Sequence, residues 1–281
     1  METSTNNPLS KFFRQPTIYL KLPSLGRWWN PGSVEPPGNQ ELAIYPMTAK
    51  DEIMLKTPDA LMNGQGMVNV IQSCVPAIKN AWDMPTVDLD AVLISIRLAT
   101  YGSNMDFETN CTHCGTKNLH GLDLSQPLSQ INCPDFEPHV HYKGLKIKLR
   151  PQNYKMATEA GVITFEEQRI NQTLLDAELP EEEKTARLTA SLEKLVDLGI
   201  KACSDSTEYI EVDGQRVTER THINDFYANA ESEVIRLLQT RVQELAQEAK
   251  IPPYDLECEE CHKEYKADLN FDYSSFFGQG F

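Results

Sequence analysis

Two closely spaced cysteine pairs constrain this sequence more than any other feature. The first pair is Cys111 and Cys114, the second is Cys258 and Cys261, and two residues separate the cysteines within each pair. That spacing lets two thiolates face one point across a tight turn, and two such turns supply the four soft ligands of a tetrahedral zinc site. The sequence therefore predicts one metal site shared by two segments with 143 residues between them.

The residues that follow each cysteine pair favour the pairing of the two segments. When Cys111 is aligned with Cys258, Leu122 falls on Leu269, so both pairs are followed by strands with the same inward-facing positions. We expect a split zinc ribbon in which two half-ribbons face each other. Because four protein ligands fill the coordination sphere, the metal would be structural.

Other interpretations of the cysteines remain open. Each pair could be a redox site, although a thioredoxin-like motif lies at a helix start, unlike the strands expected here. Each pair could also be completed by another subunit. An iron–sulfur cluster uses the same four thiolates, and His113 or His262 could replace one of them. The isolated residues Cys74, Cys133 and Cys203 are more typical of packed thiols.

The composition narrows the classes of function. The net charge of −15 disfavours direct binding to nucleic acid or to an anionic membrane surface. No stretch approaches the roughly 20 apolar residues that span a bilayer, and the polar N-terminus does not resemble a secretory signal. We therefore expect a cytosolic protein, in which seven cysteines are not a disulfide framework.

Motifs typical of enzymes are missing from the sequence. There is no His-Glu-x-x-His, no Gly-x-Ser-x-Gly and no phosphate-binding Gly-x-x-x-x-Gly-Lys. His139 and His141 lie on one face of an expected strand and could bind a metal, but a solvated strand edge is the simpler interpretation. We therefore expect no enzyme activity.

The rest of the sequence predicts an α+β fold with a mainly helical body, small β-hairpins and the split four-cysteine zinc ribbon. We divide the chain into an extended N-terminal arm (1–41), a helical region (42–101), a first half-ribbon and β-hairpin (102–150), a helical region with a β-hairpin (151–250), a second half-ribbon (251–271) and an aromatic C-terminal tail (272–281).

Local signals place several helices and turns. Thr48 and Asp51 have the spacing of a capping box, Thr57-Pro58-Asp59 is typical of a second helix start, and Asp88 is expected to cap a third helix. Lys143-Gly144 and Asp213-Gly214 predict hairpin turns. The helix that starts at Pro180 has an apolar stripe that we expect to be buried, formed by Leu188, Leu192, Leu195 and Val196.

The two ends of the chain are candidates for contacts with partners. Trp28 and Trp29 lie in a segment rich in proline and glycine, and exposed tryptophans are costly unless they dock on another surface. That surface could be the body of the chain itself or a neighbouring protein. The tail contains Tyr273, Phe276, Phe277 and Phe281 and is too short to fold alone.

Several segments together resemble a known family. They are Leu22-Pro23-Ser24 on the arm, the segment Tyr45-Pro46-Met47-Thr48-Ala49-Lys50-Asp51-Glu52, Thr57-Pro58-Asp59-Ala60-Leu61 and Gly64-x-Gly66. This pattern is similar to the baseplate hub or hub-assembly family of contractile-tailed, T-even-type bacteriophages. The likeness extends over 88–114 and returns at 258–277, whereas 150–250 carries no motif of the family.

The resemblance implies a structural subunit of a phage tail baseplate, at or near the hub, in the virion and made in the host cytoplasm. Its partners would be other baseplate, hub or tail-tube proteins in a symmetric hetero-oligomeric assembly. A second hypothesis is a hub-assembly chaperone that is absent from the mature virion. A third is a thiol-redox or metal-dependent enzyme.

Overall fold

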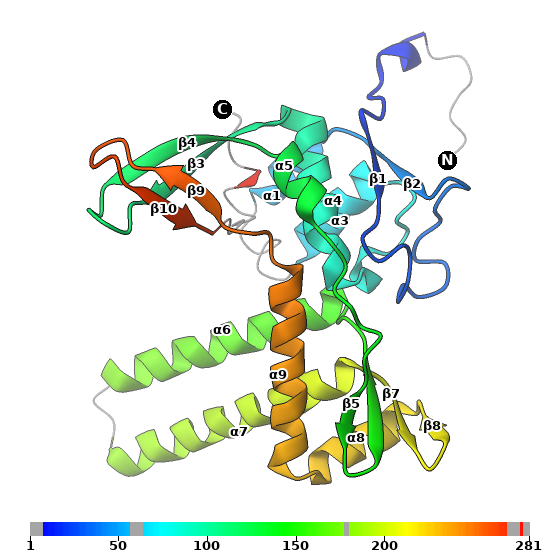
Figure 1. Ribbon diagram of the computed structural model, residues 1–281, viewed down its shortest axis with the longest axis vertical. Helices are drawn as coiled ribbons and strands as arrows, with labels where there is room; N and C mark the ends of the chain where they lie inside the picture. Colours follow the sequence, from blue (N-terminus) through cyan, green and yellow to red (C-terminus); the bar gives the residue numbers. More distant parts are fainter. Residues whose placement is uncertain (1–7, 57–63, 177–179, 269–275, 278–281) are drawn as a thin grey trace.

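The computed structural model describes residues 8–56, 64–176, 180–268 and 276–277, which form an α+β fold as the sequence predicts (Figure 1). The helices of these residues are η1 (Ser10–Phe12), α1 (Ala49–Leu55), α3 (Gln65–Cys74), η2 (Ala81–Asp83), α4 (Thr86–Tyr101), α5 (Ser125–Gln130), α6 (Tyr154–Asp176), α7 (Glu181–Asp205), α8 (Arg220–Asn229) and α9 (Ser232–Ala249). The strands are β1 (Ile18–Lys21), β2 (Glu41–Ile44), β3 (Asn104–Asn110), β4 (Lys117–Asp123), β5 (Val140–Tyr142), β6 (Leu145–Leu149), β7 (Thr207–Val212), β8 (Gln215–Val217), β9 (Tyr254–Glu257) and β10 (Glu264–Ala267).

A first core surrounds α4, with α1, α3 and the β1–β2 pair packed against it. Val92, Leu93, Ile94 and Ile96 are all buried, so α4 is apolar around most of its circumference. The expected capping box at the start of α1 is confirmed. The Asp51 amide donates to the Thr48 hydroxyl at 3.3 Å, and the Thr48 amide donates to the Asp51 carboxylate at 2.8 Å. The helix start expected at 57–59 lies outside the described residues.

The N-terminal arm lies on the body of the protein over much of its length. β1 pairs with β2 in an antiparallel register, and Leu20 and Leu22 are buried in the first core. The Trp28 ring lies 5.1 Å from the Phe136 ring, and the indole N–H of Trp29 donates to Asp88 at 2.9 Å. In the described chain both tryptophans therefore dock on the protein itself.

The expected capping role of Asp88 is wrong. α4 begins at Thr86, with Pro85 before it, and Asp88 is buried in the first turn. Its carboxylate accepts hydrogen bonds from the amide and the hydroxyl of Ser24, at 2.8 and 2.5 Å, and from the indole of Trp29. Asp88 thus fastens the N-terminal arm to the body instead of capping the helix.

A second core lies between α9 and an antiparallel sheet with the strand order β5-β6-β7-β8. The two expected hairpin turns are confirmed, because β5 and β6 flank Lys143-Gly144 and β7 and β8 flank Asp213-Gly214, with positive φ at all four residues. Pairing of β6 with β7 joins the two hairpins into one sheet. The sequence indicated the hairpins but not this long-range pairing.

The helices α6 and α7 form a long antiparallel hairpin that projects from the body past α9 (Figure 1). The apolar stripe expected to be buried on α7 is only partly so, because Leu192 and Val196 are exposed. The buried positions between the helices include the polar residues Glu167 and Ser191 instead. Among the described residues, no helix is both long and apolar enough to cross a membrane.

The C-terminal residues that the structure describes also pack on the body. Phe276 and Phe277 are buried in the first core. The buried guanidinium of Arg97 donates to the Phe276 carbonyl at 2.5 Å, and the Tyr101 hydroxyl donates to the Phe277 carbonyl at 3.4 Å. This part of the expected tail therefore contacts the protein's own core, while Tyr273 and Phe281 lie outside the described residues.

Candidate metal centre

Two β-hairpins present the two cysteine pairs. In the first, β3 and β4 pair in register from Asn104 opposite Asp123 to Asn110 opposite Lys117, and the first cysteine turn follows β3 directly. In the second, β9 and β10 pair on either side of the second cysteine turn. Figure 1 shows the two hairpins side by side, although they are far apart in the sequence. Each cysteine pair therefore lies at the turn of its own β-hairpin, whereas Leu269, the expected counterpart of Leu122, lies outside the described residues.

The two cysteine turns have the same backbone geometry. The Cys111 amide donates to the Thr116 carbonyl at 2.8 Å, and the Cys258 amide donates to the Lys263 carbonyl at 3.1 Å. The residue after each pair, Gly115 or His262, has a positive φ, of 76° or 54°. A left-handed residue is easy for glycine and less so for histidine. His262 thus completes the turn through its backbone, and its ring is exposed.

The four cysteine sulfurs converge on one point. All of them lie within 4.8 Å of one another. The Cys111 sulfur is 3.8 Å from that of Cys261, and the Cys114 sulfur is 3.6 Å from that of Cys258, so each short distance joins one hairpin to the other. A tetrahedral zinc ion with Zn–S bonds of about 2.3 Å requires sulfurs separated by about 3.8 Å. The side chains present therefore fit a tetrathiolate metal site.

Polar contacts beside the sulfurs also join the two hairpins. The hydroxyl of Tyr265 on β10 lies within hydrogen-bond distance of the Thr109 hydroxyl and 3.0 Å from the His120 ring. The Glu259 amide donates to the Asn118 side chain at 2.9 Å, and the His113 ring lies 3.0 Å from the Glu264 carbonyl. The sequence did not predict these contacts, because no spacing rule identifies partners from two distant hairpins. His113 contacts the backbone of the other half, and it is not among the clustered sulfur ligands.

Comparison with known proteins identifies the family. A family model described as "T4 bacteriophage base plate protein" matches residues 15–278. The chain belongs to this family. No curated protein and no solved structure gives a significant match. The chain is accordingly a structural or assembly protein of a T4-type phage baseplate, as the resemblance in its sequence indicates.

Two thiols of the cluster in this baseplate protein have pKa values that are shifted in opposite directions. Hydrogen bonds from Thr116 lower the pKa of Cys114 to about 6. A backbone hydrogen bond at Lys263 lowers the pKa of Cys261, but burial and the neighbouring sulfurs outweigh it and raise this pKa to about 12. Four thiolates at this distance repel one another, so all of them can ionise together only around a cation.

The acidic residues around the second cysteine pair face the solvent. Asp255, Glu257, Glu259 and Glu260 are exposed, so water can solvate their carboxylates beside the sulfur cluster. With four protein sulfurs around one point, the arrangement leaves no coordination position for a substrate. Its chemistry suits the joining of two segments.

The other cysteines of the baseplate protein lie apart from the cluster. Cys74 is buried in the first core and Cys203 in the second, and burial raises the pKa of both thiols. The half-buried Cys133 lies beside Arg27. His139 contacts the Tyr209 hydroxyl at 3.0 Å.

Proposed function

We propose that this baseplate protein is a structural subunit at or next to the hub, where it links neighbouring baseplate and tail proteins. In this proposal Cys111, Cys114, Cys258 and Cys261 hold one structural metal ion, which we assign as zinc. The convergence of four sulfurs from two distant hairpins carries the assignment, because a site saturated by protein ligands stabilises architecture rather than turning over a substrate.

Exposed apolar side chains at the N-terminal end support the linking role. Phe12 ends the short helix η1, Leu9 and Phe13 flank the helix, and all three side chains are exposed. Figure 1 shows this segment projecting from the body. Aromatic side chains on such a projection gain burial when they contact a neighbouring subunit.

Metal analysis of the purified full-length protein tests the site. We expect one zinc ion per chain by inductively coupled plasma mass spectrometry, with no labile sulfide. Iron with labile sulfide in equal amounts would replace the zinc assignment by an iron–sulfur cluster. Protein purified without any bound metal, and unable to take up zinc or iron after reduction, would overturn the site.

Mass spectrometry of purified virions tests the structural role. A stoichiometric amount of this chain, relative to other baseplate proteins, is the result expected for a structural subunit. Its presence in infected cells and absence from virions would instead support an assembly chaperone. Cross-links to tail-tube or hub proteins would support the hub-proximal position, and cross-links only to peripheral baseplate proteins would contradict it.

Titration of thiols in the native protein separates this proposal from redox chemistry. We expect the four clustered cysteines to be masked until a chelator is added. Rapid exchange of these cysteines with a disulfide reagent in the metal-loaded protein would favour an oxidoreductase.

A further inference from the structure

One stripe of α7 is uncharged and exposed over its outer half. It contains Leu192, Val196, Gly199 and Cys203, whose spacing of three or four residues places them on one side of the helix. At the base of the α6–α7 hairpin this side faces α9, because Cys203 belongs to the second core and a Cβ on Gly199 would lie 3.9 Å from the Gln239 side chain. Toward the tip, Leu192 and Val196 remain 60% and 61% exposed.

The paired charges of α7 lie on a different stripe. Arg187, Lys194 and Lys201 recur at intervals of seven residues, so they share one side of the helix. Each forms an ion pair of 2.6 to 2.8 Å with a carboxylate of α6 or α7. These three cations of α7 are thus neutralised away from the uncharged stripe.

A row of carboxylates borders the uncharged stripe. Glu182, Glu193 and Asp197 lie along the outer edge of α7, with Glu193 three residues before Val196. None of the three takes part in an ion pair among the residues that the structure describes. A surface that covers Leu192 and neutralises this edge must therefore bring positive charge.

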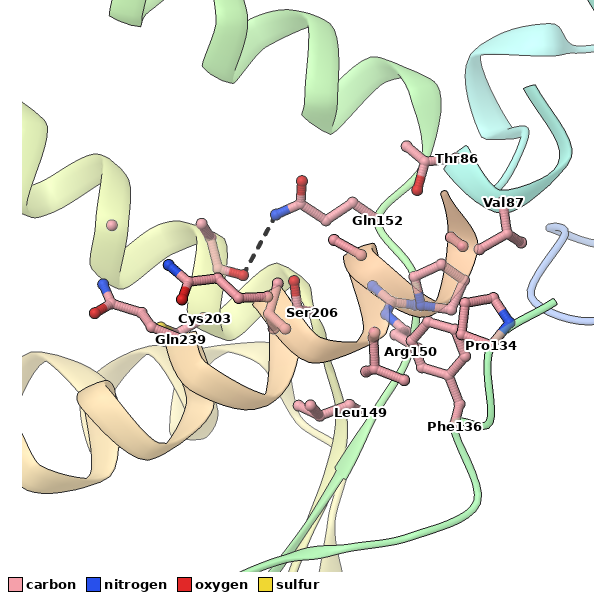
Figure 2. Close-up of a pocket in the computed structure, with 18 residues that line it drawn as sticks. Thr86, Val87, Pro134, Phe136, Leu149, Arg150, Gln152, Cys203, Ser206 and Gln239 are labelled. Carbon is pink, nitrogen blue, oxygen red and sulfur yellow. Dashed lines mark hydrogen bonds between the residues drawn. The ribbon is translucent and has the colours of Figure 1, made fainter. Parts of the chain in front are cut away.

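A pocket lies at the inner end of the uncharged stripe. Its volume is about 610 Å³, and it lies between α7, α9 and the end of β6. Gly199 and Cys203 line it together with Val242 and Ala246 of α9, and Figure 2 shows Phe136 closing the opposite wall. An apolar stripe that ends in a pocket is the geometry that binds an amphipathic helix with one bulky anchor residue.

We propose that this surface binds one amphipathic helix of another baseplate protein, whose apolar face is flanked by lysine or arginine. The inference rests on the proposed function, in which the chain works through contacts with other baseplate proteins. The carboxylates of Glu182, Glu193 and Asp197, unpaired among the described residues, favour a partner with positive charge. A second copy of this chain, with a net charge of −15, would instead bring mostly negative charge to the same edge.

The test uses the isolated full-length protein and two synthetic helical peptides of about 18 residues, which make about five turns. Both peptides carry the same leucine stripe, but one has lysine and the other glutamate beside it. Fluorescence anisotropy measures their binding. We expect the lysine peptide to bind about tenfold more tightly, Leu192→Asp to weaken its binding about tenfold, and Glu193→Lys to shift the preference toward the glutamate peptide.

Ile170→Asp is the matched control. Ile170 is also exposed on the hairpin, but its spacing places it on the stripe of Glu159 and Glu166. We expect it to leave peptide binding unchanged, with helix content measured by circular dichroism in every variant. Equal binding of both peptides, or equal weakening by Ile170→Asp and Leu192→Asp, would overturn the proposal.

Analytical ultracentrifugation of the same samples tests whether a second copy of this chain binds to the surface instead. A dimer that dissociates on Leu192→Asp would assign the stripe to a second copy and overturn the proposal as well. None of these outcomes bears on metal content or on the composition of virions. A failure of this inference is therefore distinguishable from a failure of the proposed function.

Discussion

Replacement of Cys258 by serine should release the metal and destabilise the protein. Cys258 is completely buried, and its sulfur lies 3.6 Å from that of Cys114, which is 144 positions earlier in the chain. In an unfolded chain, an ion held by both residues would close a loop of this length, at a cost of about 5 kcal/mol in chain entropy. The unfolded chain therefore does not form the complete four-cysteine metal site, whereas the folded chain does.

The expected loss of stability follows from this difference in metal binding between the folded and the unfolded chain. We expect Cys258→Ser to lower the free energy of unfolding by about 5 kcal/mol, which corresponds to a fall of about 10–20 °C in Tm for a chain of this size. Metal content should fall well below one ion per chain. A chelator should lower the Tm of the wild-type protein to that of the variant and leave the variant itself unchanged.

Cys133→Ser provides the control. Cys133 is half-buried, lies outside the sulfur cluster and contacts Arg27. It should retain both the metal and the wild-type response to chelator. Differential scanning calorimetry and metal analysis on the same samples give both readouts. A Cys258→Ser protein with one tightly bound ion and an unchanged Tm would refute the reasoning, as would loss of the metal from Cys133→Ser.

Three further predictions concern contacts within the body. Burial raises the pKa of Asp88, so the folded protein holds this proton more tightly than the unfolded chain. The stability of the wild-type protein relative to Asp88→Asn should therefore fall as the pH rises above about 4 through the folded-state pKa, and a relative rise in urea titrations would contradict this. Gly64→Ala should destabilise the folded protein by about 2 kcal/mol, because φ is 74° and the new Cβ would lie 3.0 Å from Thr158. Gly161→Ala, in the open interior of α6, should instead stabilise it by about 0.5–1 kcal/mol. Effects of equal sign in denaturant titrations would refute both expectations. Phe276→Ala should cost about 3–4 kcal/mol in the same titrations, since the side chain is buried in the first core, and a cost below about 1 kcal/mol would show that this core does not need the C-terminal segment.

Local sequence signals predict the parts of the fold that depend on near neighbours. The capping box of Thr48 and Asp51 forms because both partners are three residues apart. The turns at Lys143-Gly144 and Asp213-Gly214 form because their residues accept a positive φ. The geometry of each cysteine turn is local in the same sense. Convergence of the two turns could be inferred only because four sulfurs satisfy one tetrahedral ion.

Long-range contacts account for what the sequence did not reveal. Asp88 is a residue type that often caps helices, but its three hydrogen-bond donors come from a segment about 60 positions earlier in the chain. Pairing of β6 with β7 likewise joins strands separated by the whole α6–α7 hairpin. The periodicity of Leu192 and Val196 indicates an apolar stripe, but periodicity does not say whether the chain itself covers it.

Among the contacts that join the two cores of the protein are two separate connections, and a metal ion at the four cysteines would act on only one of these two. At the first connection, the Thr86 amide donates to the Gln152 carbonyl and the Tyr154 amide to the Met84 carbonyl, at 2.9 and 2.7 Å. At the second, the chain leaves α9, packs Ile251 and Tyr254 against the first core and enters β9. The chain thus leaves the first core after α5, builds the second core and returns to the first core through Ile251 and Tyr254. An ion held by the four cysteines would fix the hairpin that follows α9 relative to the β3–β4 hairpin, so loss of the metal should loosen the connection between the cores while each core keeps its own packing.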